Sequence, residues 1–120
     1  MTTVSKRILV VDDEPELLHI LKLYLDAKGW EVVAVSSGAA ALEAFEVGKF
    51  HAFLADVDLN DDMGGIEVAK KLLAQEPPLR VVMMSGKPEN AVKVREANLG
   101  RFVAKPFEFP HLCTLLHEDS

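Results

Sequence analysis

The sequence predicts an α/β protein in which helices cover both faces of a parallel sheet. Five short apolar runs are continuous rather than alternating, which suits strands that are buried on both faces of such a sheet. Stretches with helical spacing separate these runs, so that strand and helix alternate five times. The 120 residues contain no internal repeat, linker or low-complexity segment, and this length fits one domain.

The five expected strands are rich in valine, isoleucine and phenylalanine, which favour extended structure. Each strand is short, and each is followed directly by a polar or charged residue, although only serines without charge follow the second. In chain order they cover residues 8–11, 32–35, 52–55, 81–84 and 102–104.

The first expected helix follows the first strand and carries apolar residues at i, i+4 and i+7 from Leu17. Either Asp12 or Asp13 can cap this helix, and Pro15 suits its first turn. Gly29 is expected to end it, because glycine readily adopts the conformation that follows a helix.

The remaining helices have equally local signals. Ser36 or Ser37 is expected to cap the second helix. The third is expected to stop before Pro77, since proline cannot continue a helix. The fourth is expected around residues 89–98 and the fifth around 109–117.

The composition excludes several classes of protein. Hydrophobic residues make up 49% of the chain and charged residues 27%, which is ordinary for a globular domain. The formal net charge of −6 should repel duplex DNA, so no direct nucleic-acid binding is expected. We see no signal peptide and no apolar run near the roughly 18 residues of a membrane span. Cys113 is the single cysteine and cannot form an internal disulfide, so a cytoplasmic protein is expected.

Reactive residues follow four of the five strands. Asp12 and Asp13 follow the first, Asp56 the third, Ser85 the fourth and Lys105 the fifth. Ligands of open α/β sheets bind at the carboxyl ends of the strands, so these side chains should converge. Clustered carboxylates suit Mg²⁺, and a carboxylate can also attack phosphorus. A lysine and a hydroxyl can then hold the oxygens of a transferred phosphoryl group.

Each of these residues alone has a simpler interpretation. An acidic pair before a helix is usually a cap, and Ser85 alone is usually a turn residue. Asp61 and Asp62 are expected to be solvated loop residues, whereas Asp58 lies close enough to Asp56 to border the site. The histidines show no paired spacing for zinc. The prediction therefore depends on the conjunction at successive strand ends.

The chain resembles the receiver domain of two-component response regulators over nearly its whole length. The resemblance is carried by "ILVVDDEPELL", "AFLADVDL", "GGIEVAKKL", "VVMMSG" and "FVAKPF", in the right order and spacing. It implies a flavodoxin-like (βα)₅ fold, which is a three-layer sandwich around a five-stranded parallel sheet. It also implies one receiver domain over residues 1–120, with a core of about 7–118.

The resemblance implies a phosphorylation site. Asp56 would accept a phosphoryl group from a phosphohistidine on a sensor histidine kinase or a phosphotransfer protein. Asp13 would bind Mg²⁺ or Mn²⁺ directly and Asp12 partly through water, while the backbone carbonyl of Asp58 would complete the metal shell. Ser85 would contact the phosphoryl oxygens, together with the lysine that follows the fifth strand.

Further roles also come from the resemblance. Phe102 matches an aromatic position that changes rotamer when the hydroxyl residue moves, and the peptide bond before Pro106 would be cis. Asp58 and Lys87 stand at variable positions that modulate loss of the phosphoryl group, and their opposite charges suggest that they pair. The fourth helix, fifth strand and fifth helix would form the face that contacts an unknown output partner.

The sequence departs from the family pattern after Asp56. The family usually has a Met-Pro pair where Leu59 and Asn60 stand, and the loop before Gly65 looks one residue longer than usual. No DNA-binding output domain follows within the chain, so a stand-alone receiver and a piece of a larger protein both remain open. These departures leave the phosphorylation residues intact.

Three alternative functions fit parts of this pattern. A haloacid dehalogenase-like phosphatase would use Asp58 as acid/base, but it needs acidic metal ligands after Lys105, where only Glu108, Glu118 and Asp119 follow. A flavodoxin-type binder would need a phosphate-binding loop after the first strand, where Asp12, Asp13 and Glu14 would repel a phosphate unless a metal intervened. A degenerate receiver, acting only as an interaction module, does not explain a complete set of reactive residues. The expected protein is a phosphoacceptor and not an enzyme, apart from its own phosphorylation and dephosphorylation.

Overall fold

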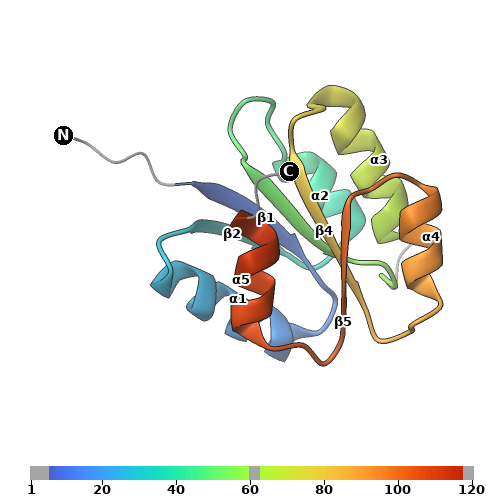
Figure 1. Ribbon diagram of the computed structural model, residues 1–120. Coiled ribbons are helices and arrows are strands. Elements are labelled where there is room, and N and C mark those ends of the chain that lie inside the picture. The colour runs from blue at the N-terminus through green and yellow to red at the C-terminus, as the bar shows by residue number, and fades with distance from the viewer. Residues whose placement is uncertain (1–5, 60–62, 118–120) are drawn as a thin grey trace.

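One parallel sheet forms the centre of the molecule. The computed structural model describes residues 6–59 and 63–117, and in these segments the five strands have the order β2-β1-β3-β4-β5 (Figure 1). Each neighbouring pair in the sheet is parallel. The strands are β1 (Arg7–Val11), β2 (Glu31–Val35), β3 (Ala52–Asp56), β4 (Arg80–Ser85) and β5 (Arg101–Ala104).

Five helices cover the two faces of this sheet, which confirms the predicted α/β class. They are α1 (Pro15–Ala27), α2 (Gly38–Ala44), α3 (Gly65–Gln75), α4 (Asn90–Glu96) and α5 (Phe109–His117). Helices α1 and α5 lie on one face, and α2, α3 and α4 lie on the other (Figure 1). Within the described segments, no helix has the length and apolar character needed to cross a membrane.

Alternate residues of the central strands supply two separate cores. Phe53 of β3 is fully buried in the core that includes Leu72 of α3. Its neighbour Leu54 is fully buried in the opposite core, together with Leu21 of α1 and Leu112 of α5. This alternation follows from the two-residue period of a strand, and it explains why the central runs are apolar at every position.

The expectation that all five strands are buried on both faces is wrong for the edge strands. No residue of β2 is buried, and in β5 only Val103 is. In contrast, every residue of β3 is buried. The reason is position, because a strand at the edge of a sheet has a neighbour on one side only and lies at the margin of the covering helices.

The structure also corrects the start of α1. The cap is Glu14, in an extended conformation and without a side-chain hydrogen bond, rather than Asp12 or Asp13. Because Pro15 is the first helical residue, its predecessor is held in extended backbone. The Asp12 carboxylate instead accepts the backbone N–H of Glu14 at 2.8 Å, which directs that carboxylate toward the edge of the sheet.

The other helix ends mostly agree with the sequence. Ser37, and not Ser36, caps α2 by accepting the Ala40 N–H at 3.0 Å. Gly29 follows α1 with a φ of 95°, a conformation that glycine adopts without strain. Helix α4 is shorter than expected and ends at Glu96, and the left-handed Asn98 (φ 57°) follows shortly after.

Strand register brings the predicted site residues to one edge of the sheet. Asp56 pairs with Met84 across β3 and β4, and Ser85 pairs with Ala104 across β4 and β5. Asp12 follows β1, whose last residue pairs with Ala55. The carboxyl ends of four strands are therefore level, and the side chains that follow them share one rim.

Candidate functional site at the carboxyl edge of the sheet

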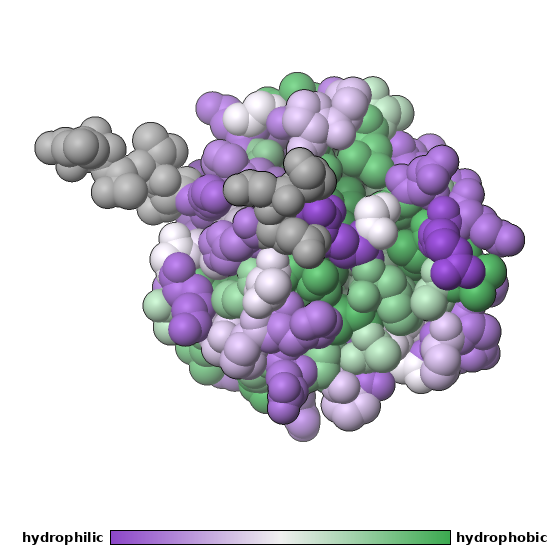
Figure 2. Space-filling view, in the orientation of Figure 1, coloured by the Kyte–Doolittle hydropathy of each residue, from purple (hydrophilic) through white to green (hydrophobic). Residues whose placement is uncertain are grey.

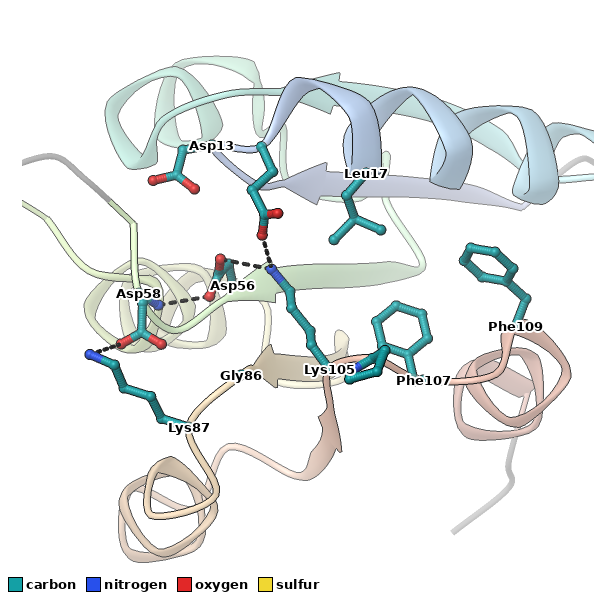
Figure 3. A pocket seen from close by; sticks show the side chains of 11 residues that line it. Asp13, Leu17, Asp56, Asp58, Gly86, Lys87, Lys105, Phe107 and Phe109 are labelled. Atoms are coloured by element: carbon teal, nitrogen blue, oxygen red, sulfur yellow. Dashed lines mark hydrogen bonds and ion pairs between the residues drawn. The ribbon is translucent and has the colours of Figure 1, made fainter.

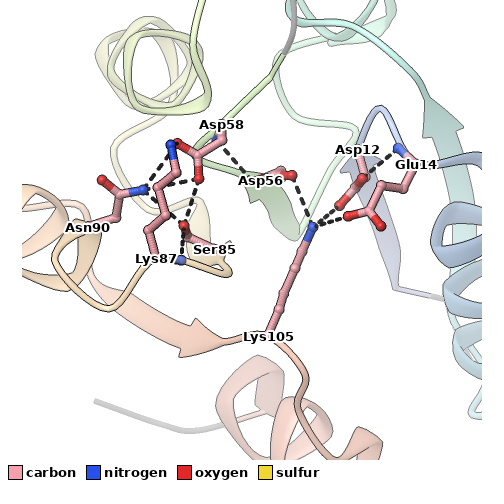
Figure 4. Close-up of polar contacts among 8 residues, drawn as sticks. All are labelled: Asp12, Glu14, Asp56, Asp58, Ser85, Lys87, Asn90 and Lys105. Carbon is pink, nitrogen blue, oxygen red and sulfur yellow. Dashed lines mark hydrogen bonds and ion pairs between the residues drawn. The ribbon is translucent and has the colours of Figure 1, made fainter.

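Two hydrogen-bonded groups of side chains face each other at this rim (Figure 4). In the first group, the Lys105 ammonium contacts Asp12, Asp56 and Glu14. The second group comprises the side chains of Asp58, Ser85, Lys87 and Asn90. The backbone N–H of Asp58 joins the two groups, since it donates to Asp56 Oδ1 at 2.9 Å.

An acidic cluster forms the floor of the first group. Asp12, Asp13 and Asp56 each offer a carboxylate oxygen, and these oxygens lie within 4.8 Å of one another. Asp12 is fully buried and Asp56 nearly so. Burial raises the pKa of the Asp12 carboxyl and the nearby Asp56 charge adds to this, although bonds from Lys105 and the Glu14 amide act in the opposite direction.

These three carboxylates fit a small divalent cation. Mg²⁺ takes oxygen ligands at about 2.0–2.1 Å, so two oxygens of one coordination shell lie at most about 4.2 Å apart. The observed spread of up to 4.8 Å needs only a small contraction. The donor set is all oxygen and partly open to solvent at Asp13, which suits an ion that keeps several waters.

Lys105 neutralises part of this cluster. Its Nζ lies 2.7 Å from Asp12 Oδ2, 3.0 Å from Asp56 Oδ2 and 3.1 Å from an oxygen of Glu14. Burial alone would lower the pKa of Lys105, but the hydrogen bonds to the three carboxylates outweigh burial and raise it well above the ordinary value. The ammonium is therefore a permanent positive charge. The peptide bond that follows it, to Pro106, is cis, as the resemblance implies.

The second group is organised around the hydroxyl of Ser85. This Oγ donates to Asp58 Oδ2 at 2.7 Å and accepts from the backbone N–H of Lys87 at 3.0 Å and from Asn90 Nδ2 at 2.9 Å. The expected pairing of Asp58 with Lys87 is present but loose, at 3.9 Å, and the Lys87 side chain is 65% exposed. Asn90, which was not singled out from the sequence, is nearly fully buried.

A cleft of about 720 Å³ opens above the first group (Figure 3). Asp56 and Lys105 line it, and Leu17, Phe107 and Phe109 give it an apolar end. Ser85 does not line this cleft and is fully buried. The carboxylate and the ammonium are therefore accessible from the cleft, whereas the hydroxyl is not.

Gly65 supports Asp56 from behind. A Cβ at Gly65 would overlap the backbone carbonyl oxygen of Asp56, so only glycine lets the start of α3 pack against the end of β3. In the sequence, the glycine pair at the start of "GGIEVAKKL" indicates a close approach of the backbone. It does not reveal that Gly65 contacts Asp56, because that contact depends on tertiary packing. The sequence gives no sign that Asn90 belongs to the site, because an asparagine at the start of a helix is usually a helix cap.

The other predicted residues differ in how deeply they are buried. Phe102 is half-buried on β5 and packs against the core under α2, α3 and α4. Leu59 is buried in that same core. Glu108, which the phosphatase alternative would need as a ligand, is exposed. Predictions for five further residues lie outside the described segments: Asn60, Asp61 and Asp62 in the loop, and the acidic residues 118 and 119.

Comparison with known proteins gives a consistent family. A family model described as the response regulator receiver domain matches residues 8–117. The alkaline phosphatase synthesis transcriptional regulatory protein PhoP of Bacillus subtilis is 36% identical over 105 residues. That match covers 86% of this chain and 43% of PhoP, so the chain spans less than half of that relative.

Solved structures agree with the fold. A CheY-like response regulator receiver domain protein from Methanospirillum hungatei superposes with a TM-score of 0.87 at 30% identity, covering 96% of this chain and 93% of that chain. The response regulator TrrA from Thermotoga maritima, solved in complex with Mg²⁺ and BeF, gives a TM-score of 0.81 at 28% identity, covering 90% and 93%. The flavodoxin-like fold is thereby confirmed.

Proposed function

The chain belongs to the response regulator receiver domain family. We propose that Asp56 is the residue that becomes phosphorylated when the domain receives a signal. Receiver domains are the phosphoacceptor signalling domains of two-component systems. The observation that carries the assignment is the setting of Asp56 at the end of β3. Its Oδ2 accepts from Lys105, its Oδ1 accepts from the Asp58 amide, and it opens onto the cleft.

The proposed donor is a phosphohistidine on a sensor histidine kinase or a phosphotransfer protein. A carboxylate oxygen of Asp56 attacks the phosphorus, a P–O bond forms and the P–N bond of the donor breaks. The departing imidazole keeps the electron pair of that bond. Lys105, already within 3.0 Å of Asp56, stabilises negative charge on the transferred oxygens, and Ser85 is assigned a further contact with them.

The metal proposed for this site is Mg²⁺, or Mn²⁺ in its place. Asp12, Asp13 and Asp56 would hold it, with the backbone carbonyl of Asp58 as a fourth protein ligand. When bound, the cation neutralises charge on the transferring phosphoryl group. The oxygen cluster supports this assignment because its spread matches one coordination shell after a small contraction.

The proposed output is a change in partner binding rather than turnover of a substrate. Figure 2 shows apolar residues gathered near the middle of the face on which Figure 1 places β5 between α4 and α5. Val92 of α4 is 44% exposed, and Phe102 and Ala104 of β5 line a shallow hollow together with His111 of α5. We assign the unidentified partner to this face, with Phe102 as its switch residue. No nucleic acid is assigned to a chain of net charge −6.

The cytoplasm is the compartment that fits this proposal. The lone Cys113 is unpaired with any other cysteine, which suits reducing conditions. The phosphoryl donors named above would then meet the domain in the same compartment.

Mass spectrometry of the intact protein tests the assignment of Asp56. With Mg²⁺ and a small acyl phosphate donor, the wild type should gain one phosphoryl group, and hydroxylamine should remove it. Asp56→Asn should gain none, whereas the matched variant Asp58→Asn should still be modified because its backbone is unchanged. Uptake of a labile phosphoryl group by Asp56→Asn would contradict the proposal.

A further inference from the structure

The hydroxyl of Ser85 is fully occupied by hydrogen bonds. A serine hydroxyl has one hydrogen to donate and two lone pairs to accept with. The hydrogen goes to Asp58 Oδ2 at 2.7 Å, and the lone pairs receive the Lys87 N–H and the Asn90 amide. Ser85 is also fully buried, so water does not compete for these bonds.

In this arrangement Ser85 cannot contact a phosphoryl oxygen on Asp56. To bind a phosphoryl oxygen on Asp56, the hydroxyl must donate its hydrogen to that oxygen, and the same hydrogen is bound to Asp58. Ser85 also lies outside the cleft that Asp56 lines. Resting on the function proposed above, we propose that Asp58 and Asn90 form a latch that holds the Ser85 hydroxyl away from Asp56 until a phosphoryl group draws it out.

Asn90 is the positioning residue of this latch. Its Nδ2 lies 3.1 Å from both carboxylate oxygens of Asp58 and 2.9 Å from Ser85 Oγ, so one amide orients both partners. Asn90 is 2% exposed, which keeps these bonds out of water and makes them costly to break.

Lys87 contributes less to the latch than its charge suggests. Its ammonium lies 3.9 Å from Asp58 and its side chain is 65% exposed, so solvent screens the interaction. Its backbone N–H is the part that contacts Ser85. Replacement of the Lys87 side chain should therefore leave the latch closed, and Lys87→Ala serves as a matched control.

Opening the latch also reaches α4. Asn90 is the first residue of this helix, and its backbone N–H donates to the carbonyl of Lys87 at 3.0 Å. When Ser85 leaves, Asn90 loses one of its acceptors and the first turn of α4 loses a contact with β4. The latch thus connects the phosphorylation site physically to the helix beside the proposed output face.

Beryllofluoride with Mg²⁺ is the probe that tests the latch, because it mimics a phosphoryl group without covalent chemistry. Protein-bound beryllofluoride is measured by fluorine NMR as the total concentration of beryllofluoride is raised. Asn90→Ala should bind about 3- to 10-fold more tightly than the wild type, since one buried hydrogen bond no longer opposes release of Ser85. Lys87→Ala should bind within about twofold of the wild type.

A double-mutant cycle with Ser85→Ala separates the latch from a general structural effect. In the Ser85→Ala background, Asn90→Ala should no longer tighten binding, because no hydroxyl remains to be released. If Asn90→Ala is too unstable to measure, Asp58→Ala provides the same cycle from the exposed side of the network. Its gain in affinity should likewise shrink when Ser85 is replaced.

Two results would overturn the latch while leaving the proposed function intact. One is unchanged or weaker binding of beryllofluoride by Asn90→Ala. The other is equal tightening with and without the Ser85 hydroxyl. Failure of the wild type to bind beryllofluoride at any Mg²⁺ concentration would instead overturn the proposed function, and the latch with it.

Discussion

Replacement of Lys105 by methionine tests how the acidic site is held together without a metal. Methionine has a similar length but no charge, so the variant removes the ammonium with little change in packing. The side chains of Lys105, Asp12 and Asp56 are 14%, 0% and 7% exposed, so this ion-pair group is largely withdrawn from water. Glu14 is 61% exposed and adds little.

The expected loss of stability follows from that burial. Removal of one partner from a buried ion pair costs about 3–5 kcal/mol, because the remaining charges stay buried without compensation. The open cleft lets water reach Asp56, so we expect the lower end, about 3 kcal/mol. An unfolding entropy of about 2.1 cal/mol/K per residue gives roughly 0.25 kcal/mol/K for this chain. The midpoint of thermal unfolding should therefore fall by about 12 °C.

Urea unfolding in the presence of a chelator is the direct assay. Trp30 is the single tryptophan and is 5% exposed, so its fluorescence reports unfolding of the core under α1 and α5. Lys87→Met is the matched control, because this lysine also faces an aspartate but is 65% exposed, and its loss should cost less than about 1 kcal/mol. Saturating Mg²⁺ should reduce the loss in the Lys105 variant by neutralising the same carboxylates. Equal stability of the two lysine variants in chelator would refute the reasoning.

Three further predictions use the same protein. Mg²⁺ at 100 times its dissociation constant should stabilise the wild type by about 2.7 kcal/mol, and Asp13→Asn should remove most of that gain in thermal melts; identical wild-type melts with chelator and millimolar Mg²⁺ would count against a metal site. Gly65→Ala should lower the free energy of unfolding by about 2–3 kcal/mol, because the new Cβ overlaps the carbonyl of Asp56. The control Gly86→Ala has open space around its Cβ and should lower it by less than about 1 kcal/mol. Equal midpoints of urea unfolding for the two variants would contradict this prediction. Once phosphorylation has drawn Ser85 away from Asp58, Lys87→Ala should shorten the lifetime of the phosphorylated protein, because the Asp58 carboxylate no longer faces an ammonium and can orient water. Truncation of that carboxylate should partly restore the lifetime, and an unchanged decay rate at fixed Mg²⁺ would exclude a kinetic role for the pair.

The strand ends explain why so much of the site could be predicted from the sequence. In a parallel sheet the carboxyl ends of strands share one edge, so Asp12, Asp56 and Lys105 had to converge once the runs before them were identified as strands. Their contacts at 2.7–3.0 Å confirm that convergence. Burial of the edge strands was predicted wrongly, because the residues of β2 and β5 alone do not reveal their position in the sheet.

The second hydrogen-bonded group was only partly accessible to the same reasoning. The pairing of Asp58 with Lys87 was expected from their opposite charges and their places two residues after strand ends, and it is observed at 3.9 Å. Asn90 lies closer to Asp58 than Lys87 does, at 3.1 Å from both carboxylate oxygens, and the turn between Lys87 and Asn90 brings it there. A turn of this kind is set by tertiary packing, and a neutral amide in the sequence gives no signal of it.

The two groups together indicate how the domain can respond to a phosphoryl group on Asp56. Both donors assigned to that group are already bound to carboxylates, Lys105 to Asp12 and Asp56, and Ser85 to Asp58. Phosphorylation of Asp56 replaces its single carboxylate charge with up to about two charges on the phosphoryl oxygens, and these oxygens compete with the remaining carboxylates for the same two donors. The free energy gained when Lys105 and Ser85 bind the phosphoryl oxygens is reduced by the free energy of the bonds to Asp12, Asp56 and Asp58 that they give up. The resting and the switched conformation of the phosphorylated domain therefore stay close in free energy. A modest difference between them is sufficient for switching, since a tenfold change in population requires only about 1.4 kcal/mol.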